Sequence, residues 1–363
     1  MAIPTELVAA ILVFLDPDHV LNLRLVSRAF DAVILDPVFA KKVMWRYYGG
    51  IVEPQAVLKN GPFFHWPRAF QEAYSMVYLV KEEHLEARVS SSKPITLPSC
   101  FGSLSNLKLI QCNNGGFSGS IPAEWSSLAS LKVLSLYNNT LTSIPHEFGN
   151  LSSLERLVLS NNLIEQIPPT FNQLRNLKSL NLSNNRLTRF DQGICTIPFL
   201  SILILSRNQI SSQIPDSLAS MYLLTILDLS YNNLTGPIPT TWKCNFLSDL
   251  NLSHNNLTAQ IPPSLCILPR LQHPNLSFNT LTGPIPETWS SPQIRTINLS
   301  HNNLTHTIPA SLAHLVFFND LDLAESELTG EVSDGFSGRR CLIWMHGNYL
   351  MGLDTVEEWV GVE

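Results

Sequence analysis

The chain has 363 residues, a formal net charge of −6 and a charged-residue content of only 14%. This balance disfavours a nucleic-acid-binding protein, because no basic stripe is present that would neutralise phosphates. No apolar run of about 18 residues occurs, so the sequence predicts no membrane span. The apolar residues 7–15 have the length of a signal-peptide core, but no Lys or Arg precedes them and no small-residue cleavage site follows. We therefore expect a soluble intracellular protein, cytoplasmic or nuclear.

The first segment, residues 1–48, has the periodicity of short helices. Leu7, Ile11 and Leu15 recur at helical spacing and predict a broad apolar face. Asp16-Pro17 and Asp36-Pro37 each place a good N-cap before a proline at the first helical position. Three helices of this size bury too little apolar surface to be stable alone, so the segment is expected to bind a partner.

This segment resembles the F-box, the module that docks on the Skp-type adaptor of cullin-based ubiquitin ligases. The resemblance rests on the run V-S-R-A-F at residues 26–30, on Pro4 and Glu6 before it, and on Asp36-Pro37 after it. It departs from the family at Ile3, where leucine is usual, and at Phe39, where tryptophan is frequent. An ordinary three-helix cap for the rest of the chain is the alternative. The resemblance implies that the following residues contact the adaptor: Pro4, Leu7, Ile11, Leu15, Leu23, Val26 and Phe30.

The next segment, residues 49–98, contains no repeat and is rich in aromatic residues. Such a density of aromatics is more often core than site. The sequence predicts a helix that begins after Pro67 and a loop at residues 90–94. We expect a helical connector that covers the first coil of the repeats, with these aromatic residues in its core: Phe63, Phe64, Trp66, Phe70 and Tyr74.

Residues 99–352 repeat one phrase, which is clearest at residues 227–239, where it reads L-D-L-S-Y-N-N-L-T-G-P-I-P. A leucine pattern L-x-x-L-x-L-x-x-N-x-L with a period in the twenties is the signature of a leucine-rich-repeat solenoid. We expect about ten to eleven repeats, followed by an acidic tail at residues 353–363. The asparagine of the phrase recurs every 23 or 24 residues, at Asn139, Asn162, Asn185, Asn208, Asn232, Asn255, Asn279 and Asn302.

Each phrase predicts one coil of the solenoid. Residues 227–229 form a short strand with leucines inward and Asp228 outward. The asparagine side chain carries a donor and an acceptor, so a stack of asparagines satisfies backbone groups where the chain turns. Ile238-Pro239 places an apolar anchor and a fixed φ on the outer side. The predicted fold is therefore α/β: a three-helix N-terminal module followed by a right-handed solenoid with a parallel sheet on its concave face.

The first repeat is expected to be irregular. With Leu107 and Leu109 as the strand leucines, Lys108 lies between them and Gln111 precedes the asparagine position. Cys112 then replaces the asparagine, and a three-residue insertion, N-G-G at residues 114–116, follows it.

Three further structural features are expected from the sequence. Pro274 stands at a strand-leucine position and removes a donor, so a local irregularity is predicted there. Residues 343–350 read as a worn last copy, as terminal repeats often do. The six cysteines lack C-x-x-C spacing and are expected to be buried free thiols in a reducing compartment.

Outward residues at the sheet form columns that are free to contact a partner. One column lies between the strand leucines, and another lies just before the asparagine. The second column is small and polar in the early repeats and becomes aromatic later, and aromatic residues often make interface hot spots. Drift at variable positions is the alternative. We hypothesise that a target protein binds the concave face through Asp228, Tyr231, Asp249, His254, Phe278 and His301.

Catalysis by this chain is not expected. The sequence shows no Ser-His-Asp or Cys-His order, no phosphate-binding glycine loop and no H-E-x-x-H. His254 and His301 lie two strands apart, roughly 9–10 Å, which is too far to share one metal ion. The sequence therefore predicts no catalytic residue, no metal and no cofactor.

The resemblance implies a non-catalytic substrate-recognition subunit of a Skp–cullin–F-box type ubiquitin ligase, with an unidentified protein target. A receptor-like extracellular binding module is one alternative, suggested by the plant-type L-x-G-x-I-P ending and by the N-x-S/T sequons within the repeats. An intracellular scaffold whose N-terminal helices do not bind the adaptor is another. Binding to a Skp-type adaptor would separate these possibilities.

Overall fold

The structure is a computed structural model that describes residues 36, 38–40, 42–43, 58, 62–66, 68–87, 95–336 and 341–351. It divides into two compact units, residues 1–164 and 165–363.

Asp36 forms the predicted N-cap, because its Oδ1 accepts the backbone N–H of Val38 at 2.7 Å and of Phe39 at 2.9 Å. The residues expected to contact an adaptor lie outside the described residues: Pro4, Leu7, Ile11, Leu15, Leu23, Val26 and Phe30.

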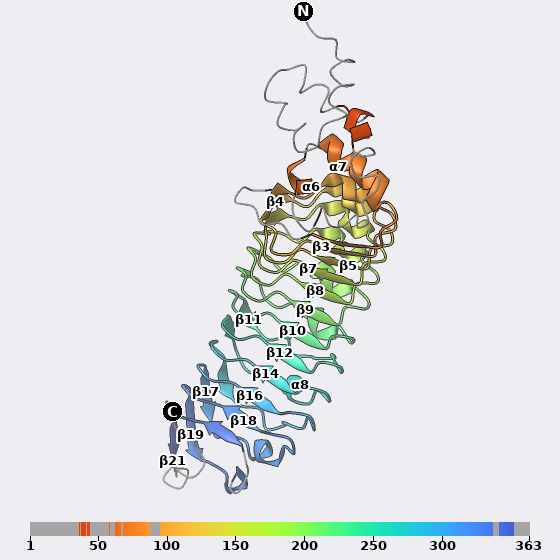
Figure 1. Ribbon diagram of the computed structural model, residues 1–363. Helices are drawn as coiled ribbons and strands as arrows, with labels where there is room; N and C mark the ends of the chain where they lie inside the picture. The colour runs from red at the N-terminus through yellow and green to blue at the C-terminus, as the bar shows by residue number, and fades with distance from the viewer. Residues whose placement is uncertain are drawn as a thin grey trace, which may run out of the picture. The chain divides into compact units, whose positions relative to one another are not determined.

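The first unit begins with helices and continues as coils (Figure 1). Its helices are α6 (Pro62–His65), α7 (Arg68–Tyr74), the π-helix η1 (Ser75–Leu79) and the 3-10 helices η2 (Ser99–Ser103), η3 (Ala123–Ser127) and η4 (His146–Asn150). Its strands are β1 (His84–Glu86), β2 (Ile95–Thr96), β3 (Leu109–Gln111), β4 (Phe117–Ser120), β5 (Val133–Ser135), β6 (Thr140–Ser143) and β7 (Arg156–Val158). Parallel pairing joins β1-β3-β5-β7 into one sheet and β2-β4-β6 into another.

The aromatic segment before the repeats forms core, as predicted. Phe63 stacks on Phe101 with ring centroids 5.6 Å apart, and Phe64 meets Phe117 edge-on at 5.1 Å. All five predicted core aromatics are buried, and α7 begins directly after Pro67. The same segment also supplies β1, which pairs in parallel with β3. The sequence did not predict this strand, because it has one leucine, Leu85, and no ladder asparagine after it.

The register assigned above to the first repeat is wrong. Ile110 pairs with Leu134 and Gln111 with Ser135, so Ile110 and Cys112 occupy the inward strand positions. Gln111, not Lys108, therefore lies in the column between them. Asn114 takes the turn position that was assigned to Gln111, and Gly115 takes the asparagine position that was assigned to Cys112. No insertion is needed, because the Leu107-x-Leu109 pair imitates the strand motif three residues too early.

The second unit contains coils throughout (Figure 1). Its sheet strands are β8 (Ser179–Asn181), β9 (Ile202–Ile204), β10 (Ile226–Asp228), β12 (Asp249–Asn251), β14 (His273–Asn275), β16 (Thr296–Asn298), β18 (Asp320–Asp322) and β20 (Leu342–Trp344). Shorter pairings join β11 (Thr235–Pro237) with β13 (Asn256–Thr258), and β15 (Thr282–Pro284), β17 (Asn303–His306), β19 (Glu327–Glu331) and β21 (Tyr349–Met351) with one another. The helices are η5 (Pro169–Gln173), η6 (Gln192–Thr196), η7 (Leu218–Ser220), α8 (Pro263–Cys266), η8 (Ala310–His314) and η9 (Asp334–Phe336).

Two irregularities predicted for this unit are confirmed. The strand β14 keeps three paired positions with β12 but only one with β16, Asn275 opposite Asn298. Pro274 accounts for this loss, because proline has no N–H to donate to the ladder. The degenerate last repeat forms a coil of the solenoid, because β20 pairs with β18. Asn348 Nδ2 donates a hydrogen bond to the carbonyl of Leu323 at 2.8 Å.

Candidate functional site

In the regular coils, the turn after the strand is held by the ladder asparagine. Asn255 Nδ2 donates to the carbonyls of Leu229 and Leu252 at 3.0 Å and of Ser253 at 3.1 Å. Its Oδ1 accepts the N–H of Leu234 at 3.0 Å. Leu229 and Leu234 belong to the preceding coil, so one buried amide joins two coils and fixes the position of the residue before it.

That preceding residue has a left-handed backbone in every regular coil. Asparagine tolerates this region, whereas a bulky side chain there is uncommon and costs roughly 1–2 kcal/mol. The later coils have bulky residues at this position in spite of the cost of the left-handed backbone. This favours a role for these side chains at the surface. The left-handed column has φ between 53° and 58° and consists of Asn114, Asn138, Asn161, Asn184, Arg207, Tyr231, His254, Phe278, His301 and Glu325.

From Arg207 to His301 the side chains of the left-handed column form a continuous stack. The Arg207 guanidinium carbon lies 4.2 Å from the centroid of the Tyr231 ring. The rings of Tyr231, His254, Phe278 and His301 follow with centroid separations of 4.0, 4.1 and 4.0 Å and interplanar angles of 10–17°. We call these five side chains the aromatic stack. Because each ring face covers the next one, the stack presents ring edges to solvent.

The stack lowers the pKa of its central imidazole, that of His254. Burial lowers the pKa of His254, and the nearby Arg207 and His301 lower it further. Tyr231 and Phe278, which enclose His254, remain 41% and 42% exposed. The column before the asparagine, predicted to become aromatic in the later repeats, therefore does bring its side chains together: Tyr231, His254, Phe278 and His301 are neighbours. These residues lie in the turns rather than on the strands.

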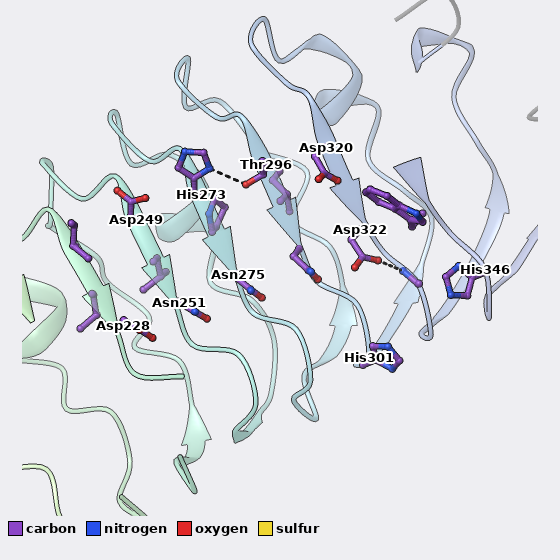
Figure 2. A pocket seen from close by; sticks show the side chains of 18 residues that line it. Asp228, Asp249, Asn251, His273, Asn275, Thr296, His301, Asp320, Asp322 and His346 are labelled. Carbon is purple, nitrogen blue, oxygen red and sulfur yellow. Dashed lines mark hydrogen bonds between the residues drawn. The ribbon is translucent and has the colours of Figure 1, made fainter. Parts of the chain in front are cut away.

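A groove of about 710 Å³ lies on the sheet face from β10 to β20. Of the predicted residues, Asp228, Asp249 and His301 line it, whereas Tyr231, His254 and Phe278 stand outside its lining in the neighbouring turns. Figure 2 shows the polar side chains of the groove on successive strands. The aromatic stack and the groove thus meet at His301.

The carboxylates and carboxamides of the column between the strand leucines are held in place by hydrogen bonds from the residue two positions later. Asp228 Oδ1 accepts the N–H of Ser230 at 3.1 Å and its hydroxyl at 2.7 Å. The equivalent asparagines bind a serine two residues later in the same way: Asn181, Asn251, Asn275 and Asn298. These side chains lie in a fixed geometry before any ligand arrives, which lowers the entropy cost of binding.

Several groove residues were missed in the sequence. His273 binds Thr296 through Nδ1 at 3.0 Å (Figure 2). Asp320 lies two residues from Asp322, and its pKa is raised by burial and then by that second carboxylate. The first strand position, which holds Asp249, His273, Thr296 and Asp320, also faces the groove. Treating this first strand position as a third column of outward residues in the sequence would have identified these side chains. Trp344 and His346 could be assigned to the groove only once the register of the last coil was known.

Comparisons with known proteins agree with this architecture. A sequence model described as a leucine-rich repeat region matches residues 87–332, and one described as F-box-like matches residues 1–44. Over 59 residues the chain is 37% identical to Receptor-like protein 39 of Arabidopsis thaliana, a stretch that is 16% of this chain and 7% of that protein.

Solved structures of plant receptors share the fold. The plant peptide hormone receptor RGFR1 in complex with RGF2 is 28% identical, with a TM-score of 0.72, and the match covers 78% of this chain and 46% of that one. A TDR receptor is also 28% identical, with a TM-score of 0.69 and coverages of 80% and 54%. The ectodomain of the Arabidopsis thaliana receptor kinase GASSHO1/SCHENGEN3 is 32% identical, with a TM-score of 0.64 and coverages of 80% and 38%.

The chain spans about half or less of the length of these relatives. In the part of the chain that the structure describes, no helix has the length and apolar character needed to cross a membrane. The coils, the asparagine ladder and the two matching sequence models lead to one conclusion. The chain belongs to the leucine-rich-repeat proteins and carries an F-box-like domain at its N-terminus.

Proposed function

We propose that the chain is the substrate-recognition subunit of a Skp–cullin–F-box type ubiquitin ligase, acting in the cytoplasm or nucleus. The observation that carries this proposal is the F-box-like match at residues 1–44 in the same chain as a repeat region at residues 87–332. The F-box-like domain docks on a Skp-type adaptor and the repeats hold a target protein. The chain supplies proximity, because it raises the concentration of target lysines near the ubiquitin carrier.

The target site of this proposal is the groove together with the aromatic stack. A groove of about 710 Å³ with preset polar groups and an adjoining set of half-exposed rings suits a protein segment. The residues assigned to it from the sequence keep that role here: Asp228, Tyr231, Asp249, His254, Phe278 and His301.

A receptor-like binding module is the second candidate function, because the solved structures that share the fold include plant receptors. That likeness concerns the repeats. The F-box-like domain supports the ligase role instead, and binding to the adaptor separates the two candidates.

The test uses the full chain co-expressed with a Skp-type adaptor and analysed by size-exclusion chromatography. We expect a stable complex with the unmodified chain and its loss in a Leu7→Arg, Leu23→Arg double variant, since a buried charge is costly in an apolar interface. A Tyr231→Ala, Phe278→Ala variant is the matched control and should keep the adaptor. Failure of the unmodified chain to bind the adaptor would refute the ligase role.

A further inference from the structure

We propose that the groove binds an extended segment of the target protein that carries two basic residues about four residues apart. This inference rests on the proposed function, because it takes the groove as the target site and adds the chemistry of the target. Three features of the groove support it: one-sided charge, oriented amide donors, and the spacing between its acidic ends.

The charge of the groove has one sign. Its lining includes four aspartates and three histidines but no lysine or arginine. Asp228 and Asp249 lie at one end, on β10 and β12, and Asp320 and Asp322 lie at the other, on β18 (Figure 2). None of the ion pairs among the described residues includes one of these four carboxylates. Each acidic end is therefore complementary to a cation from outside the chain.

Between the acidic ends lie amides of known orientation. Asn275 Oδ1 accepts the N–H of Ser277 at 3.0 Å and its hydroxyl at 2.7 Å. Because a backbone N–H can only donate, the accepting atom must be the amide oxygen, and Nδ2 is left as the outward donor. Asn251 and Asn298 have the same geometry on the two adjacent strands. Among the described residues, no hydrogen bond uses the Nδ2 donors of these three side chains, so they suit the carbonyls of a peptide backbone.

The spacing of the acidic ends sets the spacing of the basic residues. Register pairs run from Asp249 to His273 and from Thr296 to Asp320, so β12 and β18 are separated by three strand-to-strand steps. At about 4.8 Å per step this is roughly 14 Å, which an extended chain covers with about four residues. A peptide crossing the strands therefore brings one cation to each end.

The end near Asp322 favours arginine. Trp344 pairs with Asp322 in register, and its half-buried indole also lines the groove. A guanidinium there can stack on the indole while it donates two hydrogen bonds to a carboxylate, which an ammonium cannot do as well.

The test selects peptides against the full chain from a phage-displayed library of random nine-residue sequences. We expect selected sequences to carry Arg or Lys at two positions about four apart, with Arg dominant at one of them. A selected peptide, synthesised with a fluorophore, should bind an Asp320→Asn, Asp322→Asn variant about tenfold more weakly by fluorescence polarisation. An Asp216→Asn, Glu287→Gln variant removes the same charge outside the groove and should change the affinity less than about twofold.

Selection of acidic or apolar sequences, selection of none, or equal weakening by the groove variant and its control would overturn the inference. The thermal midpoint of both variants shows that each is folded. The groove variant should still bind the adaptor, so the two proposals fail separately. Loss of peptide selection with the adaptor bound refutes this inference alone, whereas peptide selection without adaptor binding refutes the ligase role and supports the inference.

Discussion

The ladder asparagine gives the sharpest stability prediction. Asn255 is buried and makes four hydrogen bonds, three as a donor and one as an acceptor. Asn255→Ala removes all four and leaves buried backbone groups of two coils without these partners. At about 1 kcal/mol for each bond, the free energy of unfolding should fall by about 4 kcal/mol.

Equilibrium urea unfolding followed by far-UV circular dichroism measures this change in the free energy of unfolding. The urea concentrations at the unfolding midpoint are compared with one m-value for both chains. The neighbouring Asn256 is exposed, and Asn256→Ala should change the free energy of unfolding by less than about 0.5 kcal/mol. A loss below about 1 kcal/mol for Asn255→Ala would show that water replaces the amide, and that the ladder does not carry the turn.

Three further outcomes are expected. Ser326 occupies a ladder position and its buried hydroxyl has no hydrogen-bond partner among the described residues, so Ser326→Asn should raise the free energy of unfolding by about 1–2 kcal/mol in the same assay. Burial and Asp322 raise the pKa of Asp320 above its unfolded value, so its ionised carboxylate opposes folding at pH 7. Asp320→Asn should therefore stabilise the chain by a few tenths of a kcal/mol at pH 7, and this gain should disappear as the pH falls through the folded pKa towards the unfolded value. With a thiol reagent on the folded chain, Cys195 should react first, because the other five cysteines are buried and burial raises the pKa of Cys112 to about 12; reaction of Cys112 at an equal rate would contradict this.

The repeat architecture could be predicted from sequence because its determinants are local. A leucine such as Leu227 and an asparagine such as Asn232 have one role in every coil, and the period repeats that role. The first coil was assigned wrongly because Leu107 and Leu109 satisfy the same short motif as Ile110 and Cys112. Only pairing with the next strand separates the two registers.

The candidate site was predicted in part for the same reason. Tyr231 and His301 were found because their column sits at a fixed offset from the asparagine. The face-to-face stacking of Tyr231 on His254 and of Phe278 on His301 could not be predicted, because it follows from the left-handed turn that orients each ring along the stack. Asp320 and Trp344 join the groove through strand pairing across coils, which a linear pattern does not encode.

The left-handed column also has a consequence for how such a protein diversifies. The turn requires only that its residue tolerate a positive φ, and the hydrogen bonds that build it come from the backbone and from the next residue, such as Asn255 beside His254. Asn161 and Phe278 therefore occupy equivalent slots despite their different chemistry. Substitution in one coil leaves the framework of its neighbours intact, so a lineage can rewrite its partner preference one coil at a time without first evolving a new fold.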